Sequence, residues 1–152
     1  MDLKEFKSLI DLFFYQAGKQ NPQSAFLEWL NPKNKKKFTW GETSSNIYKL
    51  AKTLKASIAD GDRCLLVSEN RPEWLISDIA IMLANGITVP AYTTYTEKDY
   101  KYLIEDCQPS VIIVSNDEMH DKLKNIIDEK SFIRKVITFD KIKEVDYKGG
   151  NL

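Results

Sequence analysis

The sequence is poor in the residues that build disulfide frameworks and metal sites. Two of its 152 residues are cysteine and one is histidine. Cys64 and Cys107 lie far apart, and neither belongs to a CxxC pair or has a histidine nearby. No disulfide and no metal site is therefore predicted. We expect both cysteines to fill space as small apolar residues, as free cysteine commonly does.

Long apolar runs are also missing. The longest, Ile76–Leu83, is interrupted by Ser77 and Asp78 and falls far short of the ~20 residues that a membrane-spanning helix needs. The first residues, Met1–Phe6, carry charges of both signs instead of the unbroken apolar stretch of a signal peptide. The sequence therefore predicts no transmembrane segment, and we expect a cytoplasmic location.

Neither sign of charge is in excess. Lysine and arginine together number 22, as do aspartate and glutamate, and the isoelectric point is about 6.6. A duplex-binding domain carries a basic surface, so no nucleic-acid partner is expected. Apolar residues make up 43% of the chain, and a chain of about 150 residues can bury roughly 68–70% of its unfolded surface. These values predict a globular domain.

The N-terminal third predicts two helices with a β-hairpin between them. Apolar side chains recur at helical spacing over Leu3–Lys19. The hairpin is expected to have strands at 25–30 and 37–39. The second helix is expected to open at the capping-box pattern Thr39–Glu42. The lysine run 35–37 is expected to form the solvated tip of the hairpin.

From Asp60 onward, strands and helices alternate. Short β-branched runs predict four strands, and the amphipathic segments between them predict three helices. The expected strands are Arg63–Val67, Ile87–Val89, Val111–Val114 and Lys135–Phe139, and the expected helices run over 72–85, 96–107 and about 115–130. Pro90 is expected to halt the second strand, and Asn85 with Gly86 to end the first of these helices in a left-handed turn.

Strict alternation of this kind predicts the α/β fold class. We expect a mainly parallel sheet flanked by helices, with right-handed crossovers and a small β-hairpin near the N-terminus. Residues 1–140 are expected to form this unit. Residues 141–152 are polar and without periodicity, and a loose tail is expected there.

The motifs of common catalytic and phosphate-binding sites are absent. The sequence contains no GxGxxG after a strand, no GxxxxGK[ST] and no GxSxG. His120, the single histidine, stands among acidic residues near a predicted helix start and is expected to be a solvated surface residue. The residues by themselves indicate no catalytic group.

Three segments in consistent order resemble the adenylate-forming (AMP-binding) enzymes, the family of acyl-CoA synthetases, luciferases and peptide-synthetase adenylation domains. Segment 38–42, FTWGE, is similar to the first core motif of that family. Segment 61–74, GDRCLLVSENRPEW, resembles a stretch typical of long-chain fatty acyl-CoA synthetases. Segment 82–92, MLANGITVPAY, resembles the second core motif, which usually has alanine or glycine where Asn85 stands. The resemblance covers about residues 5–140.

The resemblance implies an N-terminal subdomain of the acyl-CoA synthetase/luciferase fold. In that family, ATP and a carboxylate give an acyl-adenylate and pyrophosphate, and CoA then forms a thioester. The phosphate-binding loop, the segment that seats adenine and magnesium, and the catalytic lysine would lie downstream of Leu152. We therefore expect a catalytically incomplete part of a fatty acyl-CoA ligase. It would hold no cofactor itself, while ATP, Mg and CoA would serve the complete enzyme.

Two segments are candidates for ligand contacts. Asn70–Trp74 places a polar turn at a helix N-terminus, where an anion can bind. Alternatively, Asn70 caps the helix, Pro72 begins it and Trp74 packs. Thr94 follows a strand end, where ligands collect in open α/β sheets, and the resemblance implies that it lies near the approach of CoA. Turn formation is the other interpretation of Thr94. No catalytic residue and no metal ligand is assigned.

A freestanding noncatalytic α/β module for binding or assembly is the alternative to the ligase, since fold alone does not choose between them. The acyl-chain length is left open, as are aryl and peptide-synthetase substrates, because the family's substrate pocket is built mainly downstream. An isolated subdomain would expose an apolar seam, so self-association is expected. Val111–Val114 would be prone to aggregation if it lay at a sheet edge.

Overall fold

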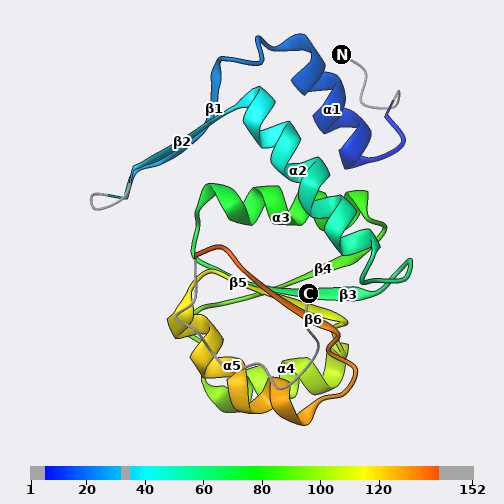
Figure 1. The fold of residues 1–152 in the computed structure, drawn as a ribbon, viewed down its shortest axis with the longest axis vertical. Helices are drawn as coiled ribbons and strands as arrows, with labels where there is room; N and C mark the ends of the chain where they lie inside the picture. The colour runs from blue at the N-terminus through cyan, green and yellow to red at the C-terminus, as the bar shows by residue number, and fades with distance from the viewer. Residues whose placement is uncertain (1–5, 32–34, 141–152) are drawn as a thin grey trace.

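The computed structural model describes residues 6–31 and 35–140. A four-stranded parallel sheet lies at its centre, with helices on both faces (Figure 1). The strands are β3 (Arg63–Val67), β4 (Ile87–Ala91), β5 (Val111–Val114) and β6 (Lys135–Thr138). Their order in space is β4-β3-β5-β6. The predicted α/β class with a mainly parallel sheet is confirmed.

The two central strands are the most deeply buried part of the sheet. Strand β3 pairs in parallel with β4 and with β5, and β5 also pairs with β6. Leu65 of β3 therefore lies between Val89 and Ile112. All four residues of β5 are buried. Val111–Val114 is an inner strand, so the aggregation-prone edge considered above does not arise from it; the sheet edges are β4 and β6.

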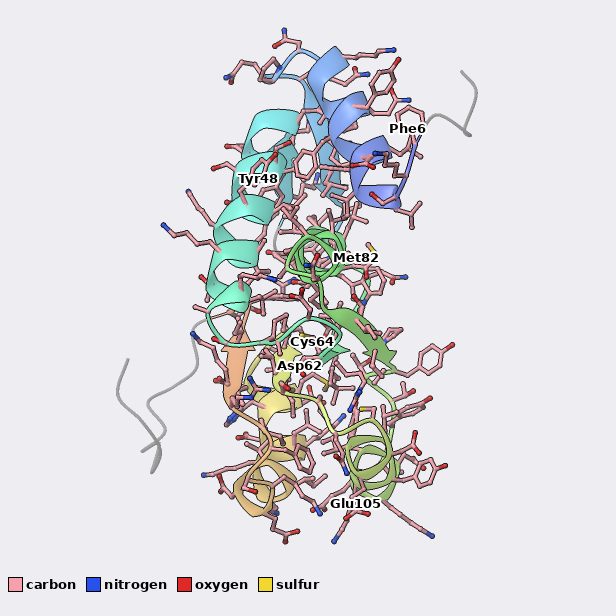
Figure 2. The ribbon with its side chains drawn as sticks, turned by 90° about the vertical axis from the view of Figure 1, so that its right-hand side faces the viewer. Phe6, Tyr48, Asp62, Cys64, Met82 and Glu105 are labelled. Carbon is pink, nitrogen blue, oxygen red and sulfur yellow. The ribbon has the colours of Figure 1, made fainter. Side chains whose placement is uncertain are left out.

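Helices form layers on both faces of the sheet. Helices α4 (Glu97–Cys107) and α5 (Asp117–Glu129) cover one face (Figure 1). Helix α3 (Pro72–Leu83) covers the other face, and α2 (Trp40–Lys55) packs on α3. Figure 2 shows Glu105 of α4 at one end of the molecule and Tyr48 of α2 toward the other.

Alternate side chains of the central strands enter two separate cores, because successive residues of a strand point to opposite faces. Cys64 and Leu66 belong to the core under α2 and α3. Leu65 and Val67 belong to the core under α4 and α5. Each face is thus sealed by its own set of helices, and both sets of side chains in β3 are buried. Such a two-sided strand is typical of a parallel sheet.

Helix α1 (Leu9–Lys19) and the antiparallel hairpin of β1 (Ala25–Trp29) and β2 (Lys36–Thr39) complete the fold at the α2 end. The hairpin stands out from the body of the molecule (Figure 1). Its base is fixed by aromatic packing, since the rings of Phe26 and Trp40 stack with their centroids 3.7 Å apart.

The predicted helix starts at Thr39 and Thr96 carry side-chain caps. Thr39 with Glu42 and Thr96 with Asp99 each form a complete capping box, in which the threonine side chain accepts from the backbone of the acid and the acid accepts from the backbone of the threonine. At the end of α3, Asn85 adopts a left-handed conformation with φ of 63°. These local signals placed the helix ends within a few residues.

The amino end of β3 is fixed by Asp62, within the GDR sequence. Its carboxylate accepts hydrogen bonds from the Ala59 amide at 2.9 Å, the Ser110 hydroxyl at 2.8 Å and the Arg134 guanidinium at 2.7 Å. The hydrogen bond from the Ala59 amide contributes most to lowering the pKa of Asp62. Figure 2 shows Asp62 beside Cys64 at the start of the strand. Asp62 therefore joins three segments at the amino ends of the strands, the end of the sheet opposite to their carboxyl ends.

Several predicted bounds differ from the structure by one or two residues, and the start of α1 differs by more. Helix α1 was expected to begin at Leu3. That residue lies outside the described ranges, but residues 6–8 lie inside them and are not helical. The side chain of Ser8 accepts from the Asp11 amide and starts the helix at Leu9. Strand β4 was expected to stop before Pro90 but continues to Ala91. Because β4 is an edge strand, only one of its sides must donate to the ladder, and a residue without an N–H is tolerated.

The prediction of a solvated His120 was also wrong. Its side chain is 3% exposed, because it lies on the same side of α5 as Met119 and Leu123, which pack into the core. The acidic neighbours in the sequence suggested a polar surface, whereas the helical phase turns this position inward.

No helix in the described ranges is long and apolar enough to cross a membrane.

Candidate functional site at the carboxyl ends of the strands

A cleft of about 430 Å³ opens where the carboxyl ends of β3 and β4 meet the start of α3. Residues from the loop after β3, from α3 and from the end of β4 line it: Ser68, Glu69, Asn70, Trp74, Pro90, Ala91, Tyr92 and Thr93. This is the edge at which open α/β sheets bind ligands. The cleft combines two aromatic rings with a carboxylate, an amide and hydroxyl groups.

The wall formed by residues 92–95 is held by hydrogen bonds to its backbone. The Tyr95 amide donates to the Tyr92 carbonyl at 3.2 Å and closes a turn. The buried Tyr100 of α4 donates its hydroxyl to the same Tyr92 carbonyl at 2.7 Å. Thr94 is exposed on this turn and is not among the residues that line the cleft, whereas its neighbour Thr93 is.

The opposite wall begins at Ser68, where β3 ends. The Ser68 hydroxyl donates to the Glu69 carbonyl at 2.9 Å. Asn116, which caps α5, donates its side-chain amide to the Glu69 carboxylate at 3.2 Å. The exposed Glu69 is therefore held at the mouth of the cleft by a residue from the neighbouring strand–helix turn.

Behind this wall, Arg71 is buried with its side chain 2% exposed. Its guanidinium donates to Glu73 at 2.9 and 3.1 Å and to Asp140 at 2.9 and 3.0 Å. The charged plane also lies 4.7 Å from the ring centroid of Trp29 and 5.4 Å from that of Phe139. All three donor nitrogens are thus used, and the cation joins the hairpin, α3 and the end of β6.

The carboxyl groups of this cluster are ionised over the whole neutral range. Burial acts to raise the pKa of Glu73, but hydrogen bonds from Arg71 and Lys36 outweigh it and lower the pKa to about 2. The hydrogen bond from Arg71 likewise lowers the pKa of Asp140. Burial acts to lower the pKa of Arg71, and its bonds to Asp140 and Glu73 raise it instead. The cluster therefore consists of mutually stabilised charges.

This geometry corrects the capping interpretation of Asn70–Trp74. Arg71, not Asn70, occupies the cap position, without a side-chain capping bond, and Pro72 begins the helix as predicted. The anion beside the helix start is the chain's own Glu73. Asn70 instead lines the cleft together with Trp74, because the chain is still extended at Arg71 and the helix begins one residue later than an Asn70 cap requires.

Lys36 corrects the expectation of a fully solvated lysine run. Its ammonium donates to Glu73 at 2.8 Å and is 30% exposed, whereas Lys37 is 58% exposed. Lys36 pairs with Trp29 across the hairpin, and these two residues face Arg71 and Glu73. The strand pleat therefore separates one lysine of the run from its neighbour.

Neither cysteine is a nucleophile candidate. Burial raises the pKa of the Cys64 thiol to about 11, and the charge of Asp62 adds to this. Burial also raises the pKa of Cys107, which is half-buried. A reactive cysteine needs the opposite change. Cys64 fills space in the core as expected.

An ATP–magnesium site requires several kinds of group in one place. Such a site needs a loop of backbone amides, an available cation and carboxylates gathered around the metal. Among residues 6–31 and 35–140, no group of three or more histidine, cysteine, aspartate or glutamate side chains is placed to hold a metal ion. The buried cation beside the cleft, Arg71, is already bonded to two carboxylates.

Comparison with protein families shows which family has this sequence pattern. The family model described as "AMP-binding enzyme" matches residues 13–149. The chain belongs to the AMP-binding enzyme family. The sequence segments that suggested this assignment form the start of α2, the β3–α3 turn and the α3–β4 turn. The second and third of these segments include residues that line the cleft.

Curated relatives are named as acyl-coenzyme A synthetases and long-chain-fatty-acid–CoA ligases. The human protein named acyl-coenzyme A synthetase ACSM5, mitochondrial, is 32% identical over 104 residues, which are 66% of this chain and 18% of that protein. The long-chain-fatty-acid–CoA ligase of Bacillus subtilis is 35% identical over 79 residues, 51% of this chain and 14% of that protein. The chain thus spans less than a fifth of the length of these relatives.

Solved structures described as a CoA ligase and an AMP ligase share the fold of this chain. The crystal structure of the anthranilate CoA ligase AuaEII with anthranoyl-AMP matches with a TM-score of 0.82 and 18% identity, over 97% of this chain and 28% of that one. The fatty acid AMP ligase from Legionella pneumophila matches with a TM-score of 0.69 and 21% identity, over 89% and 24%. The predicted fold family is confirmed, including the hairpin near the N-terminus.

The structure adds residues to the site that sequence reasoning missed. Glu69 was part of the GDRCLLVSENRPEW segment, but only the fold shows that it lines a cleft with Tyr92. Asp140 carried no sequence signal, since it meets Arg71 only in the folded chain. Lys122 of α5 contacts the Thr93 carbonyl at 3.2 Å, and nothing in its local sequence indicated that contact.

Proposed function

We propose that this chain is part of an ATP-dependent fatty acyl-CoA ligase. In that reaction the acid displaces pyrophosphate from ATP to give an acyl-adenylate, and the CoA thiol then displaces AMP to give the thioester. The observation that carries the proposal is the AMP-binding family match over residues 13–149. It is supported by relatives named as acyl-CoA synthetases and long-chain-fatty-acid–CoA ligases. The solved neighbours share less than 25% identity and support the fold alone.

We further propose that this chain is catalytically incomplete by itself and that its role is that of a framework. Transition states of phosphoryl and acyl transfer are stabilised by preorganised charges and donors. The buried guanidinium of Arg71 is committed to Glu73 and Asp140. ATP and magnesium would accordingly be held by residues outside this sequence.

Thr94 remains the proposed contact for CoA. Its support is its exposed position on the turn that follows β4, beside the cleft at the carboxyl edge of the sheet. We also propose a cytoplasmic location, although some relatives carry "mitochondrial" in their names. The alternative of a freestanding noncatalytic module has no support from the comparisons.

The test of incompleteness is ATP binding and turnover by the 152-residue chain. The chain should not exchange labelled pyrophosphate into ATP with any fatty acid. Calorimetry should give a dissociation constant for ATP no tighter than millimolar, which corresponds to about −4 kcal/mol. Micromolar binding of ATP would contradict the proposal. The groups that bind the phosphates would then be sought first among the lysines of the hairpin.

The test of the ligase assignment is reconstitution. The open reading frame should continue past Leu152, and joining the downstream sequence should restore fatty-acid-dependent pyrophosphate exchange. The restored protein should then form a thioester with CoA. A stop codon directly after Leu152 would favour the noncatalytic module instead.

A further inference from the structure

Helix α5 touches both walls of the cleft. At its start, Asn116 donates its side-chain amide to the Glu69 carboxylate at 3.2 Å. Two turns further on, Lys122 donates to the Thr93 carbonyl at 3.2 Å. Glu69 belongs to the wall that follows β3, and Thr93 belongs to the wall that follows β4. One helix therefore connects two loops that the sheet alone would leave independent.

The contact of Lys122 falls on a backbone atom of the loop and not on a side chain. Thr93 and Tyr92 offer consecutive carbonyls, and each is bonded from a different helix, by Lys122 of α5 and by Tyr100 of α4. The amide of Tyr95 closes the turn onto the Tyr92 carbonyl. The loop backbone is thus fixed at three points, while the side chain of Thr94 stays exposed.

Lys122 is suited to this contact by its length and charge. Its side chain is 37% exposed, and its ammonium also lies 3.3 Å from the carboxylate of Glu118, one helical turn earlier. Hydrogen bonds from a charged donor are stronger than those from a neutral one. The Glu118 carboxylate lies on the same side of α5 and holds the lysine head near the loop.

We propose that Lys122 is a positioning residue that fixes the backbone of residues 92–95 and thereby the wall of the cleft. The inference rests on the proposed function in one respect, since the loop would present Thr94 to CoA. Lys122 itself acts through Thr93 and touches no reacting atom. Variation at this helix position would change the shape of the site without changing a residue that lines it.

The experiment compares amide hydrogen exchange in the 152-residue chain and in its K122M variant, which keeps an apolar stem and removes the donor. The Tyr95 amide should exchange about fivefold faster in K122M, the factor expected from the loss of one hydrogen bond. Thermal unfolding should be nearly unchanged, because the side chain is partly exposed. The K122R variant should restore slow exchange.

The matched control is K124M, which makes the same substitution at an exposed position of the same helix. Exchange of the Tyr95 amide should stay at the wild-type rate in K124M. The Y100F variant, which removes the other donor to this loop, gives a second way to loosen the same turn. If K122M leaves the Tyr95 amide unchanged while Y100F accelerates it, Lys122 does not position the loop and the proposal is overturned.

A titration with CoA separates this inference from the proposed function. Because the site of this chain is incomplete, CoA should bind only weakly; added in large excess, it should still shift the amide resonance of Thr94 in the wild-type chain, and K122M should reduce that shift. If CoA leaves the wild-type Thr94 resonance unmoved, the proposed CoA contact fails, whereas the exchange result still decides the role of Lys122. If CoA shifts Thr94 equally in both proteins and exchange is unchanged, the positioning role is refuted and the contact survives.

Discussion

The guanidinium of Arg71 and the carboxylate of Asp140 are joined by two hydrogen bonds, at 2.9 and 3.0 Å. Arg71 stands at the entrance of α3 and Asp140 just after β6, at the far edge of the sheet. The pair therefore links the loop after β3 to the residue that follows β6, across the carboxyl end of β5, which lies between them. Because Arg71 also bonds Glu73 and lies against Trp29, the hairpin is tied to the same point.

Removing the buried cation should be the most damaging change in this region. R71M leaves Glu73 and Asp140 without their main partner, and breaking a buried ion pair on one side costs about 3–5 kcal/mol. Urea unfolding should show this loss. The control K37M removes an exposed pair with Glu28 at 3.6 Å and should cost less than about 0.5 kcal/mol. Equal losses in the two variants would contradict the role assigned to Arg71.

Acid should weaken the fold through Glu73. Its pKa is lowered from the ordinary 4.5 to about 2, so its contribution to stability is complete above pH 4.5 and is lost as the pH falls from there through 2. That contribution is on the order of 3 kcal/mol. The unfolding free energy of E73Q should therefore fall less steeply than that of the wild type over this interval, with a residual slope from Asp140. Parallel pH curves would disprove the assignment.

The left-handed Asn85 offers a test of backbone strain. N85A places an unfavourable φ on alanine and should cost about 1–2 kcal/mol. N85G accepts the same φ freely and should stay within about 0.5 kcal/mol of the wild type. Both variants lose the side-chain bond to Asp60 at 3.2 Å, so the difference between them isolates the backbone. Thermal unfolding that ranks both variants alike would rule out this origin.

Pro90 should protect an open edge of the sheet. Strand β4 is an edge strand. Two exposed aromatic side chains follow it in the sequence, Tyr92 directly after the strand and Tyr102 on α4. A proline on an edge strand hinders pairing with another chain. P90T should self-associate at a several-fold lower concentration than the wild type in sedimentation velocity. Identical concentration dependence would show that Pro90 has no protective role.

Sequence reasoning predicted the elements well because their signals are local. Capping boxes at Thr39 and Thr96 fix where helices begin, since each motif satisfies backbone amides within four residues. The β-branched strand Val111–Val114 was placed with its exact ends, because turn residues bound it on both sides. The family resemblance was visible for the same reason, since its motifs are short contiguous segments.

The candidate site was predictable only in part. The rule that ligands bind at the carboxyl ends of parallel strands pointed to the end of the sheet where the cleft opens, and Thr94 lies beside that cleft. The lining of the cleft by Glu69 and Thr93 depends on which loops become neighbours, which follows from the strand order β4-β3-β5-β6. That order is a property of the packed sheet and is not written in any one segment.

The sequence by itself determined the class of fold, the helix starts at Thr39 and Thr96 and the family, because periodicity, capping and contiguous motifs act over a few residues. Tertiary structure decided the rest. It turned His120 inward through the phase of α5, brought Arg71 to Asp140 and set Lys122 against the Thr93 carbonyl. Each of these features joins segments far apart in the chain or depends on which helix face meets the sheet. Burial adds most at Arg71, whose side chain is 2% exposed.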